Sequence, residues 1–526
     1  MPVLEWIGKK AVVNHHREVP CHLLKCDREL SAGDPGSGNL LVQGDNLLAL
    51  KALLPYYAGR VKCIYIDPPY NTGNENWVYN DAVNSPEIRK WLGKVVGAEA
   101  EDLSRHDKWL SMMYPRLMVL REFLAGNGVI LISIDDTELG HLRLVLDEIF
   151  GKPNFIGAFV WNTRNTDNRV KTFLSPDHEY ILVYGRSRGA SILGRRIDRS
   201  DFKNPDDDPR GPYVTDPLTG KATAAERPNL HAYNMEQPGT NNVWKPDPAK
   251  GWITDEVGYK TLLKDSRIWW PPNPATGKPR KKRFLSETRE RMPASSFWPE
   301  FRALSGAKEV GDILGERVFA FPKPLSVIQK VIDHCTPVDC IVLDSFAGTG
   351  TTAHAVLAQN KADGGSRRFI LVEMEEQICQ DVTARRLKRA IEGHNNLPAL
   401  GGGFRYCRLG APVFDETGNI RAGVTFAELA AHVYFAETGE PLPKRTNRKT
   451  PLLGVHNGKA VYLLFNGILG DRSPGGGNVF TNTVLKALPA HDGPRIIYGE
   501  GSRLGRARLK REDIVFRQIP YGIKVS

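Results

Sequence analysis

The apolar run Cys63–Ile66 and the loop that follows it constrain the fold of this chain more than any other segment. The run is rich in β-branched and aromatic residues, which is typical of a buried strand. Pro68 and Pro69 cannot donate to a strand ladder, so pairing must end there, and each proline restricts the backbone around it. We therefore expect a buried strand that delivers Asp67 and Tyr70 on a stiff loop. From this stretch alone, a strand ending in an ordinary proline turn remains the alternative.

Regular α/β patterns occupy two blocks of the chain, and a loop-rich segment separates them. Strands are expected at 40–45, 63–66, 128–134, 155–161, 180–184, 340–343 and 368–372, and helices at 46–57, 106–124, 139–150 and 325–332. The predicted domains are an N-terminal extension 1–38, a first α/β half 39–185, an insertion 186–311, a second α/β half 312–410 and a C-terminal domain 411–526. Residues 72–86 are predicted to form a flap beside the loop.

The insertion combines basic residues with tryptophans. Residues 151–310 carry 27 Lys and Arg against 19 Asp and Glu, which is +8 of the chain's net charge of +11. Cations and flat rings suit phosphate contacts and base stacking, so this segment favours a nucleic-acid partner over a merely solvated basic face. The residues in question are Lys264, Arg267, Trp269, Trp270, Lys278, Arg280, Lys281, Lys282 and Arg283.

The seven cysteines are too few and too scattered to predict a disulfide framework. Cys21/Cys26 and Cys335/Cys340 approach zinc-ligand spacing, but their intervening residues favour buried free thiols, and no metal site is predicted. No apolar run approaches the roughly 18 residues of a membrane span, and the first 30 residues lack a signal peptide's apolar stretch. We therefore expect a cytoplasmic protein.

A second motif, Asp344–Thr352, predicts a binding site for a nucleoside cofactor. Its glycines allow close backbone approach, and Glu373 follows at the end of the next strand, where an acid can accept hydrogen bonds from both ribose hydroxyls. A nicotinamide dehydrogenase is the usual interpretation of such a turn. Phe346, however, adds bulk where a pyrophosphate would need room, and that interpretation leaves Asp67–Tyr70 without a role.

Methyl transfer to an exocyclic amino group uses both motifs. The nitrogen lone pair is delocalised into the base ring, so acceptors aimed at the two amino hydrogens favour its attack on a sulfonium methyl. Asp67 and the Pro68 carbonyl supply such acceptors, and Tyr70 is expected to stack on the base. A duplex base must first be flipped out, at a cost of a few kcal/mol.

Asp67-Pro68-Pro69-Tyr70 together with Asp344–Gly350 resembles the paired motifs of amino-group DNA methyltransferases, in the permuted order of the beta class. Three further segments are similar to the modification subunits of type III restriction-modification systems: Glu5–Lys9, Asp177–Tyr184 and Phe321–Pro324. The resemblance covers most of residues 1–410. It implies an α/β, Rossmann-like S-adenosylmethionine-dependent methyltransferase fold, circularly permuted, with an inserted target-recognition domain and a small C-terminal α+β domain.

The resemblance also implies site residues and partners. The catalytic residues are Asp67, Pro68, Pro69 and Tyr70. The residues expected to bind S-adenosyl-L-methionine are Asp45, Asp67, Lys323, Pro324, Asp344, Phe346, Gly348, Gly350, Thr351, Thr352 and Glu373. The implied partners are double-stranded DNA, a separate translocase-nuclease restriction subunit and a second copy of the chain in a homodimer. The sequence equally permits a solitary methyltransferase, which would act without a restriction subunit.

The implied reaction is methylation of adenine N6, because the Asp-Pro-Pro-Tyr form usually accompanies adenine in this family. An N4-cytosine DNA methyltransferase and an RNA amino-methyltransferase share the same chemistry and remain alternatives. A carbon-methylating cytosine enzyme needs a Pro-Cys nucleophile loop after a strand, and the single Pro20-Cys21 pair lies far from any Gly-rich strand end. A non-catalytic DNA-specificity subunit would require the Asp67 loop to be vestigial, yet its residues are intact.

Overall fold

The computed structural model describes residues 4–72, 105–166, 174–316, 318–319, 321–394, 398–415, 419–443, 450–467, 473 and 475–519. The expected flap at 72–86 falls, except for Thr72, outside these residues. The chain divides into two compact units: Gly194–Pro293 forms one, and the segments before and after it form the other. The domain boundaries expected from the sequence stay predictions.

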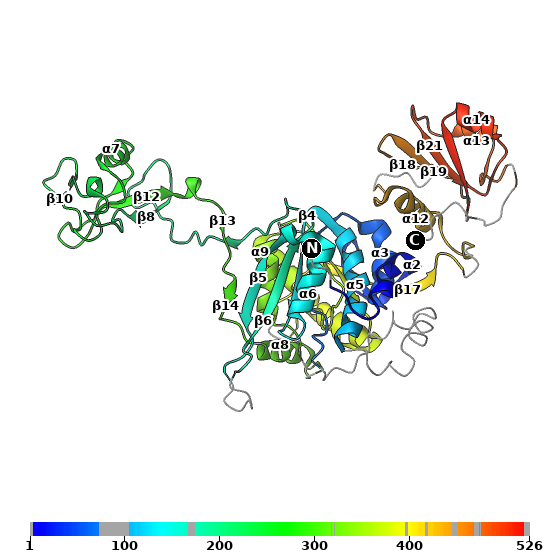
Figure 1. The fold of residues 1–526 in the computed structure, drawn as a ribbon, viewed down its shortest axis with the longest axis horizontal. Coiled ribbons are helices and arrows are strands. Elements are labelled where there is room, and N and C mark those ends of the chain that lie inside the picture. The colour runs from blue at the N-terminus through cyan, green and yellow to red at the C-terminus, as the bar shows by residue number, and fades with distance from the viewer. Residues whose placement is uncertain are drawn as a thin grey trace. The chain divides into compact units, whose positions relative to one another are not determined.

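A ten-stranded mixed sheet organises the larger unit (Figure 1). Its strand order is β1-β17-β2-β16-β15-β3-β4-β6-β5-β14, and the run from β17 to β4 is parallel. The β6 strand then pairs antiparallel with both β4 and β5. The bounds are β1 His22–Gly33, β17 Gly403–Pro412, β2 Leu40–Gln43, β16 Arg368–Glu373, β15 Ile341–Asp344, β3 Val61–Ile66, β4 Leu124–Ile134, β6 His178–Gly185, β5 Phe155–Asn162 and β14 Phe297–Trp298.

Helices cover both faces of this sheet. Successive side chains of a strand point to opposite sides, and here the side chains on both sides are apolar, so both faces must be buried. In β3, Ile64 and Ile66 pack into one hydrophobic core with α3 (Asn46–Tyr57), α5 (Arg105–Phe123) and α6 (Leu139–Leu146). Cys63 and Tyr65 pack into the other core with α9 (Leu325–Cys335), α10 (Thr351–Asp363) and α11 (Arg385–Glu392). Both faces of the sheet are therefore buried, as a near-continuous apolar strand such as β3 requires.

The structure confirms the α/β elements expected in both blocks, including a helix at 46–57, with small shifts at their ends. The expected helix 139–150 is shorter, because α6 ends at Leu146 and a π-turn follows at Asp147–Gly151. These elements are long and strongly periodic, so local pattern suffices to identify them.

One edge of the sheet is formed by two strands that the sequence did not predict. Residues 22–33, within the expected N-terminal extension 1–38, form the twelve-residue strand β1. Its partner β17 runs from Gly403 to Pro412. Cys26 and Cys407 lie directly opposite each other in this antiparallel pair and form a disulfide, so the prediction of a free thiol at Cys26 is wrong. Sequence periodicity carries no information about such a pairing between residues almost 400 positions apart.

The smaller unit, Gly194–Pro293, is built from short elements around its own core, as expected for a loop-rich segment. Its three-stranded antiparallel sheet comprises β8 (Tyr213–Pro217), β12 (Arg280–Phe284) and β11 (Ile268–Trp269), accompanied by the α7 helix (Glu256–Lys264). Aromatic residues dominate its core, and their bulk compensates for the shortness of the strands. The buried members are Leu218, Tyr233, Met235, Trp244, Trp252, Tyr259 and Ile268.

The last part of the chain has a second, four-stranded sheet in the order β18-β19-β21-β23, with β19, β21 and β23 parallel. The strands are Leu452–His456, Lys459–Leu463, Arg495–Gly499 and Ile514–Gln518. The α12 helix (Phe426–Thr438) precedes them, and a capping box of Thr425 and Glu428 fixes its start. No helix in the described parts of the chain is long and apolar enough to cross a membrane.

Candidate functional site

Four acids meet at one edge of the main sheet. Asp45, Asp67, Asp344 and Glu373 each stand at or just beyond the carboxyl end of one of the parallel strands β2, β3, β15 and β16. The carboxyl ends of parallel strands share an edge, and ligands of open α/β sheets bind there. The two sequence motifs, which are more than 270 residues apart, become neighbours because β3 pairs with β15.

Hydrogen bonds hold the loop after β3 in place. The indole Nε1 of Trp109 donates to the carbonyl oxygen of Pro69 at 2.7 Å. Pro68 is buried, whereas the side chains of Asp67 and Tyr70 are partly exposed. Asn71 closes the loop in the left-handed region at φ 62°, which asparagine tolerates better than most residues. The stiffness expected from two prolines is thus reinforced from outside the loop.

Lys323 lies between two carboxylates at this edge. Its Nζ is 2.9 Å from Oδ1 of Asp67 and 3.3 Å from Oε2 of Glu179, and it stands 4.7 Å from the ring centre of Tyr70. The Tyr70 hydroxyl donates to the same Glu179 oxygen at 3.0 Å. Burial lowers the pKa of Lys323, but the two carboxylates outweigh that effect and raise it above its ordinary value. The lysine expected at the cofactor therefore contacts the Asp67–Tyr70 loop directly.

The Gly-rich turn after β15 is organised by the side chain of Asp344. Its Oδ1 accepts the amide of Phe346 at 3.0 Å, and its Oδ2 accepts the hydroxyl of Thr352 at 2.6 Å. Gly348 and Gly350 adopt φ of 50° and 76°, so the turn requires residues without a Cβ. A Cβ on Gly348 would meet only the ring of Phe319 among the described residues, at 3.7 Å, so the outer side of this turn is open.

Glu373, at the end of β16, binds the same turn. Its Oε2 accepts the amide of Gly348 at 2.7 Å and its Oε1 the amide of Glu375 at 3.0 Å. Burial raises the pKa of Glu373 to about 7, against which the amide hydrogen bonds act only in part. Burial likewise raises the pKa of Asp344 to about 7. Two acids at one strand edge thus have pKa values near 7. Such raised pKa values are common at functional sites, and buried ion networks also produce them.

Asp45 caps the α3 helix, accepting the amide of Leu48 at 2.8 Å. Its second oxygen is 3.2 Å from the guanidinium of Arg116, which is fully buried and also donates to Asn46. Asn46 in turn donates to the Ser345 carbonyl at 3.4 Å. These bonds tie the end of β2 to the Gly-rich turn, so Asp45 lies with the other predicted cofactor residues.

The remaining predicted cofactor residues surround the turn. Thr351 begins α10, and its hydroxyl donates to the Lys323 carbonyl at 3.2 Å. Pro324 is the N-cap of α9. The side chain of Phe346 is buried. The structure therefore brings all the predicted site residues to one strand edge.

Motif reasoning gave no individual role to several residues here. Glu179 is the second residue of the antiparallel strand β6. The first part of β6 lies beside the end of β4, so Glu179 reaches this edge from a strand that runs in the opposite direction. Arg116 and Arg386 are both fully buried, and Arg386 donates to the hydroxyls of Thr349 and Thr351 at 2.8 Å each. An arginine inside an apolar helical face, as at position 116, is the signal that could have been used.

Within the smaller unit, several basic residues expected to contact phosphates bind acids of the same unit. Lys282 is 5% exposed and pairs with Asp206 and, at 3.0 Å, with Asp208. Arg267 pairs with Glu287, and Arg283 pairs with Asp216. Lys282 is therefore a core residue of this unit. The number of basic residues in the unit that can contact a polyanion is smaller than the sequence predicts.

Residues 61–384 match the model of a family described as DNA methylase. The chain is 32% identical over 401 residues to the type III restriction-modification enzyme StyLTI Mod subunit of Salmonella typhimurium, covering 73% of this chain and 60% of that protein. It is 31% identical over 375 residues to the type II methyltransferase M.KpnI of Klebsiella pneumoniae, covering 67% of this chain and 84% of that protein. The chain thus spans less than two thirds of the Salmonella subunit.

Among solved structures, the complex of M1.HpyAVI with SAM is similar over 66% of this chain and 98% of that one. The identity is 14% and the TM-score is 0.31.

Proposed function

The chain belongs to the N6/N4 DNA methylase family, and on that basis we propose that it transfers a methyl group from S-adenosyl-L-methionine to adenine N6 in duplex DNA. The membership confirms the resemblance seen in the sequence. The main sheet likewise fits the expected Rossmann-like methyltransferase fold. The observation that carries the proposal is the juxtaposition of the Asp67–Tyr70 loop and the Gly-rich turn on the adjacent strands β3 and β15.

The catalytic loop offers the acceptors that this reaction needs. The carboxylate of Asp67 and the carbonyl of Pro68 accept the two amino hydrogens of a flipped adenine, which frees the nitrogen lone pair for attack. Lys323 orients Asp67 from 2.9 Å and balances its charge, while Glu179 holds both Lys323 and the Tyr70 hydroxyl. Tyr70 stacks on the base. Fixing these groups before the base arrives avoids the large rate loss that follows from ångström-scale misplacement.

The residues at the Gly-rich turn fit the proposed cofactor. Glu373 accepts hydrogen bonds from the ribose hydroxyls, and the open side of Gly348 admits the cofactor. When bound, S-adenosylmethionine supplies an electrophilic methyl group on that sulfonium. The chain's part is to orient it toward Asp67, since β15 places the turn beside the catalytic loop.

The similarity to type III Mod subunits supports a further part of the proposal: that the chain is the modification subunit of a restriction-modification system. In that case it acts with a separate restriction subunit and forms a homodimer. Co-expression with the neighbouring open reading frame, followed by size-exclusion chromatography, tests this. A chain that methylates DNA but elutes alone as a monomer contradicts the assembly and leaves the activity standing.

The activity itself is tested with labelled cofactor and mixed-sequence DNA, followed by digestion to nucleosides. We expect label in N6-methyl-2′-deoxyadenosine. Label in N4-methylcytosine, or label only when RNA is the substrate, would identify one of the alternative amino-methyltransferases and refute the assignment.

A matched pair of variants tests the catalytic loop. Asp67→Ala should abolish transfer and leave cofactor binding largely intact. The control Asp492→Ala, which alters an exposed acid in the C-terminal part, should retain both methyl transfer and cofactor binding. Near-normal methylation by Asp67→Ala would remove the role assigned to that carboxylate. No transfer by any form, including the unaltered protein, would favour a non-catalytic specificity subunit.

A further inference from the structure

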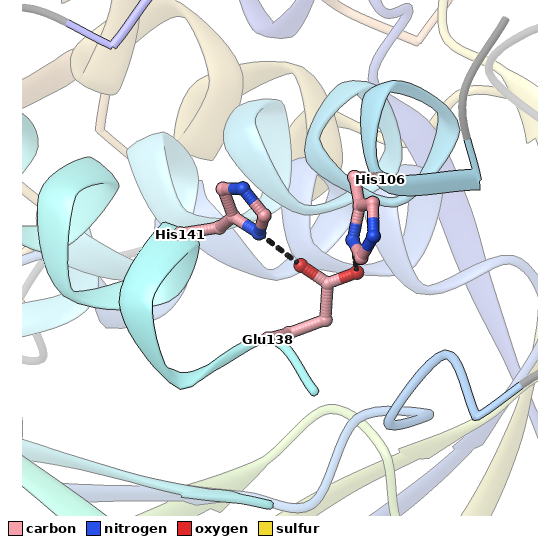
Figure 2. A group of neighbouring side chains, drawn as sticks. All are labelled: His106, Glu138 and His141. Atoms are coloured by element: carbon pink, nitrogen blue, oxygen red, sulfur yellow. Dashed lines mark hydrogen bonds and ion pairs between the residues drawn. The ribbon is translucent and has the colours of Figure 1, made fainter. Parts of the chain in front are cut away.

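Two imidazoles and one carboxylate converge between the start of α5 and the start of α6 (Figure 2). His106 lies at the start of α5, Glu138 is the N-cap of α6, and His141 follows in the first turn of α6. Nδ1 of His106 is 2.6 Å from Oε1 of Glu138, and Nδ1 of His141 is 2.8 Å from Oε2. One potential ligand atom from each residue lies within 4.8 Å of the others.

The charge of Glu138 requires a nearby cation. Its side chain is 0% exposed, and burying a carboxylate is costly unless positive charge and hydrogen bonds compensate it. Among the described residues no lysine or arginine forms an ion pair with Glu138. Its partners are the side-chain amide of Asn71 and the two imidazoles. Among the described residues, the groups that face this carboxylate are thus one amide and two imidazoles, and an ion bound between the three side chains would supply positive charge.

We propose that His106, Glu138 and His141 bind one divalent transition-metal ion, and that Zn²⁺ suits the site best. Two imidazoles and a carboxylate form a ligand set that zinc accepts, with a fourth position for water. The rings are 38% and 37% exposed, so an ion can enter from solvent while the carboxylate stays buried. Tetrahedral coordination places ligand atoms about 3.3 Å apart. The nitrogen–oxygen contacts must therefore widen by about half an ångström, and ligand atoms that are up to 4.8 Å apart must move closer through side-chain rotation.

The site bears on the catalytic loop through Asn71. The Asn71 side chain is buried and donates to Oε1 of Glu138, while its backbone holds the left-handed conformation that ends the loop. A bound ion fixes the Glu138 carboxylate, and hydrogen-bonded partners of a metal ligand are held in turn. The metal therefore stabilises the loop that carries Asp67, and it is assigned no part in the chemistry.

The experiment measures metal binding by the full chain, without DNA or methyl donor, after stripping with a chelator and dialysis. Competition with a chromophoric chelator gives the Zn²⁺ affinity and stoichiometry, and Co²⁺ absorption reports a tetrahedral nitrogen-oxygen site. We expect one tight ion per chain. His106→Gln and His141→Gln should each weaken it about a hundredfold or more, whereas His456→Gln, a histidine outside the cluster, should not.

Zn²⁺ should also raise the thermal midpoint of the unaltered chain and of His456→Gln, and leave that of His141→Gln unchanged, because binding to the folded state alone stabilises it. Circular dichroism of the stripped proteins checks that each variant is folded. If the unaltered chain takes up no Zn²⁺ at micromolar concentration, or His141→Gln binds it equally well, the site does not exist. Both results are independent of methyl transfer, so they leave the proposed activity untouched.

Discussion

Cofactor binding should depend on pH through Glu373. Burial raises its pKa to about 7 in the protein without ligand. The ribose hydroxyls that we assign to Glu373 donate hydrogen bonds. The ionised carboxylate accepts them at both oxygens, whereas the protonated acid can accept fewer, because one of its oxygens carries the proton. Binding therefore selects the ionised form, and cofactor affinity must rise with pH while Glu373 titrates.

The size of the effect follows from the pKa. An acid with a pKa of about 7 is roughly one eleventh ionised at pH 6 and ten elevenths ionised at pH 8, so the affinity should increase about tenfold across this range. Tenfold corresponds to about 1.4 kcal/mol of binding free energy. The α-amino group of the cofactor titrates near pH 8 in the same window. The informative quantity is therefore the difference between the unaltered chain and Glu373→Gln, which share that group.

Isothermal titration calorimetry of both proteins at pH 6, 7 and 8, in two buffers of different ionisation enthalpy, measures affinity and proton release together. We expect Glu373→Gln to bind more weakly and to lose the tenfold dependence. The unaltered chain should release about 0.9 proton from this group at pH 6 and about half a proton at pH 7. If Glu373→Gln retained the full dependence, the titrating group would be another one and the argument would fail.

The same shift predicts the opposite trend for the stability of the ligand-free protein. The folded pKa of Glu373 lies above the ordinary value of 4.5, so the unfolded chain loses its proton first as pH rises. Stability from this group is present below about pH 4.5 and is lost by about pH 7, to the extent of about 3 kcal/mol. Urea unfolding at pH 5 and 7.5 should show this loss, and Glu373→Gln should reduce it. Equal losses in both proteins would contradict the assignment.

Three further substitutions have defined outcomes. Lys323→Met removes the cation shared by the catalytic loop and β6, so single-turnover methyl transfer should slow by at least about tenfold with a cofactor Kd close to normal; an unchanged rate would contradict the orienting role. Lys282→Met removes the buried cation between Asp206 and Asp208, while Asp208 keeps its ion pair with Arg210. It should lower the free energy of unfolding in urea by about 1–3 kcal/mol, whereas Lys264→Met, on an exposed position, should not. Gly350→Ala places a Cβ 2.9 Å from a methyl carbon of Thr383 at φ 76°, so cofactor affinity measured by calorimetry should fall about tenfold; normal affinity would show that the turn can relax.

The candidate site could be predicted from the sequence because its main residues sit at strand ends. An apolar run that stops at an acid can be recognised in the sequence alone. In a parallel sheet the carboxyl ends of such strands lie at the same edge. The sequence pattern assigned Glu179 no role, because the pattern considers acids at the ends of parallel strands. Glu179 lies near the start of an antiparallel strand, which is the end of that strand that reaches the same edge. Lys323 was assigned to the cofactor, but its side chain contacts Asp67 and Glu179, and no local pattern could indicate that direction.

Charged residues show the same limit in the smaller unit. A run such as Arg280–Arg283 indicates positive charge, but whether each side chain faces a polyanion or an internal acid depends on which strand pairs beside it. The pairing of β12 with β8 places Arg283 within reach of Asp216, and packing buries Lys282 against Asp208. Composition gives the sign of a segment's charge, and tertiary contacts determine how much of it remains available.

The sequence by itself determined the α/β elements, the loop carrying Asp67 and the glycine turn after Asp344, because propensity, proline restriction and periodicity act over a few residues. Only the tertiary structure decided that β1 and β17 complete the sheet, that Lys323 balances two acids, and that His106, Glu138 and His141 meet. These features depend on contacts between distant segments. The stabilising free energy of these contacts is gained only after the chain has closed the long loops between the segments. The local sequence does not encode which partner a side chain meets at that point.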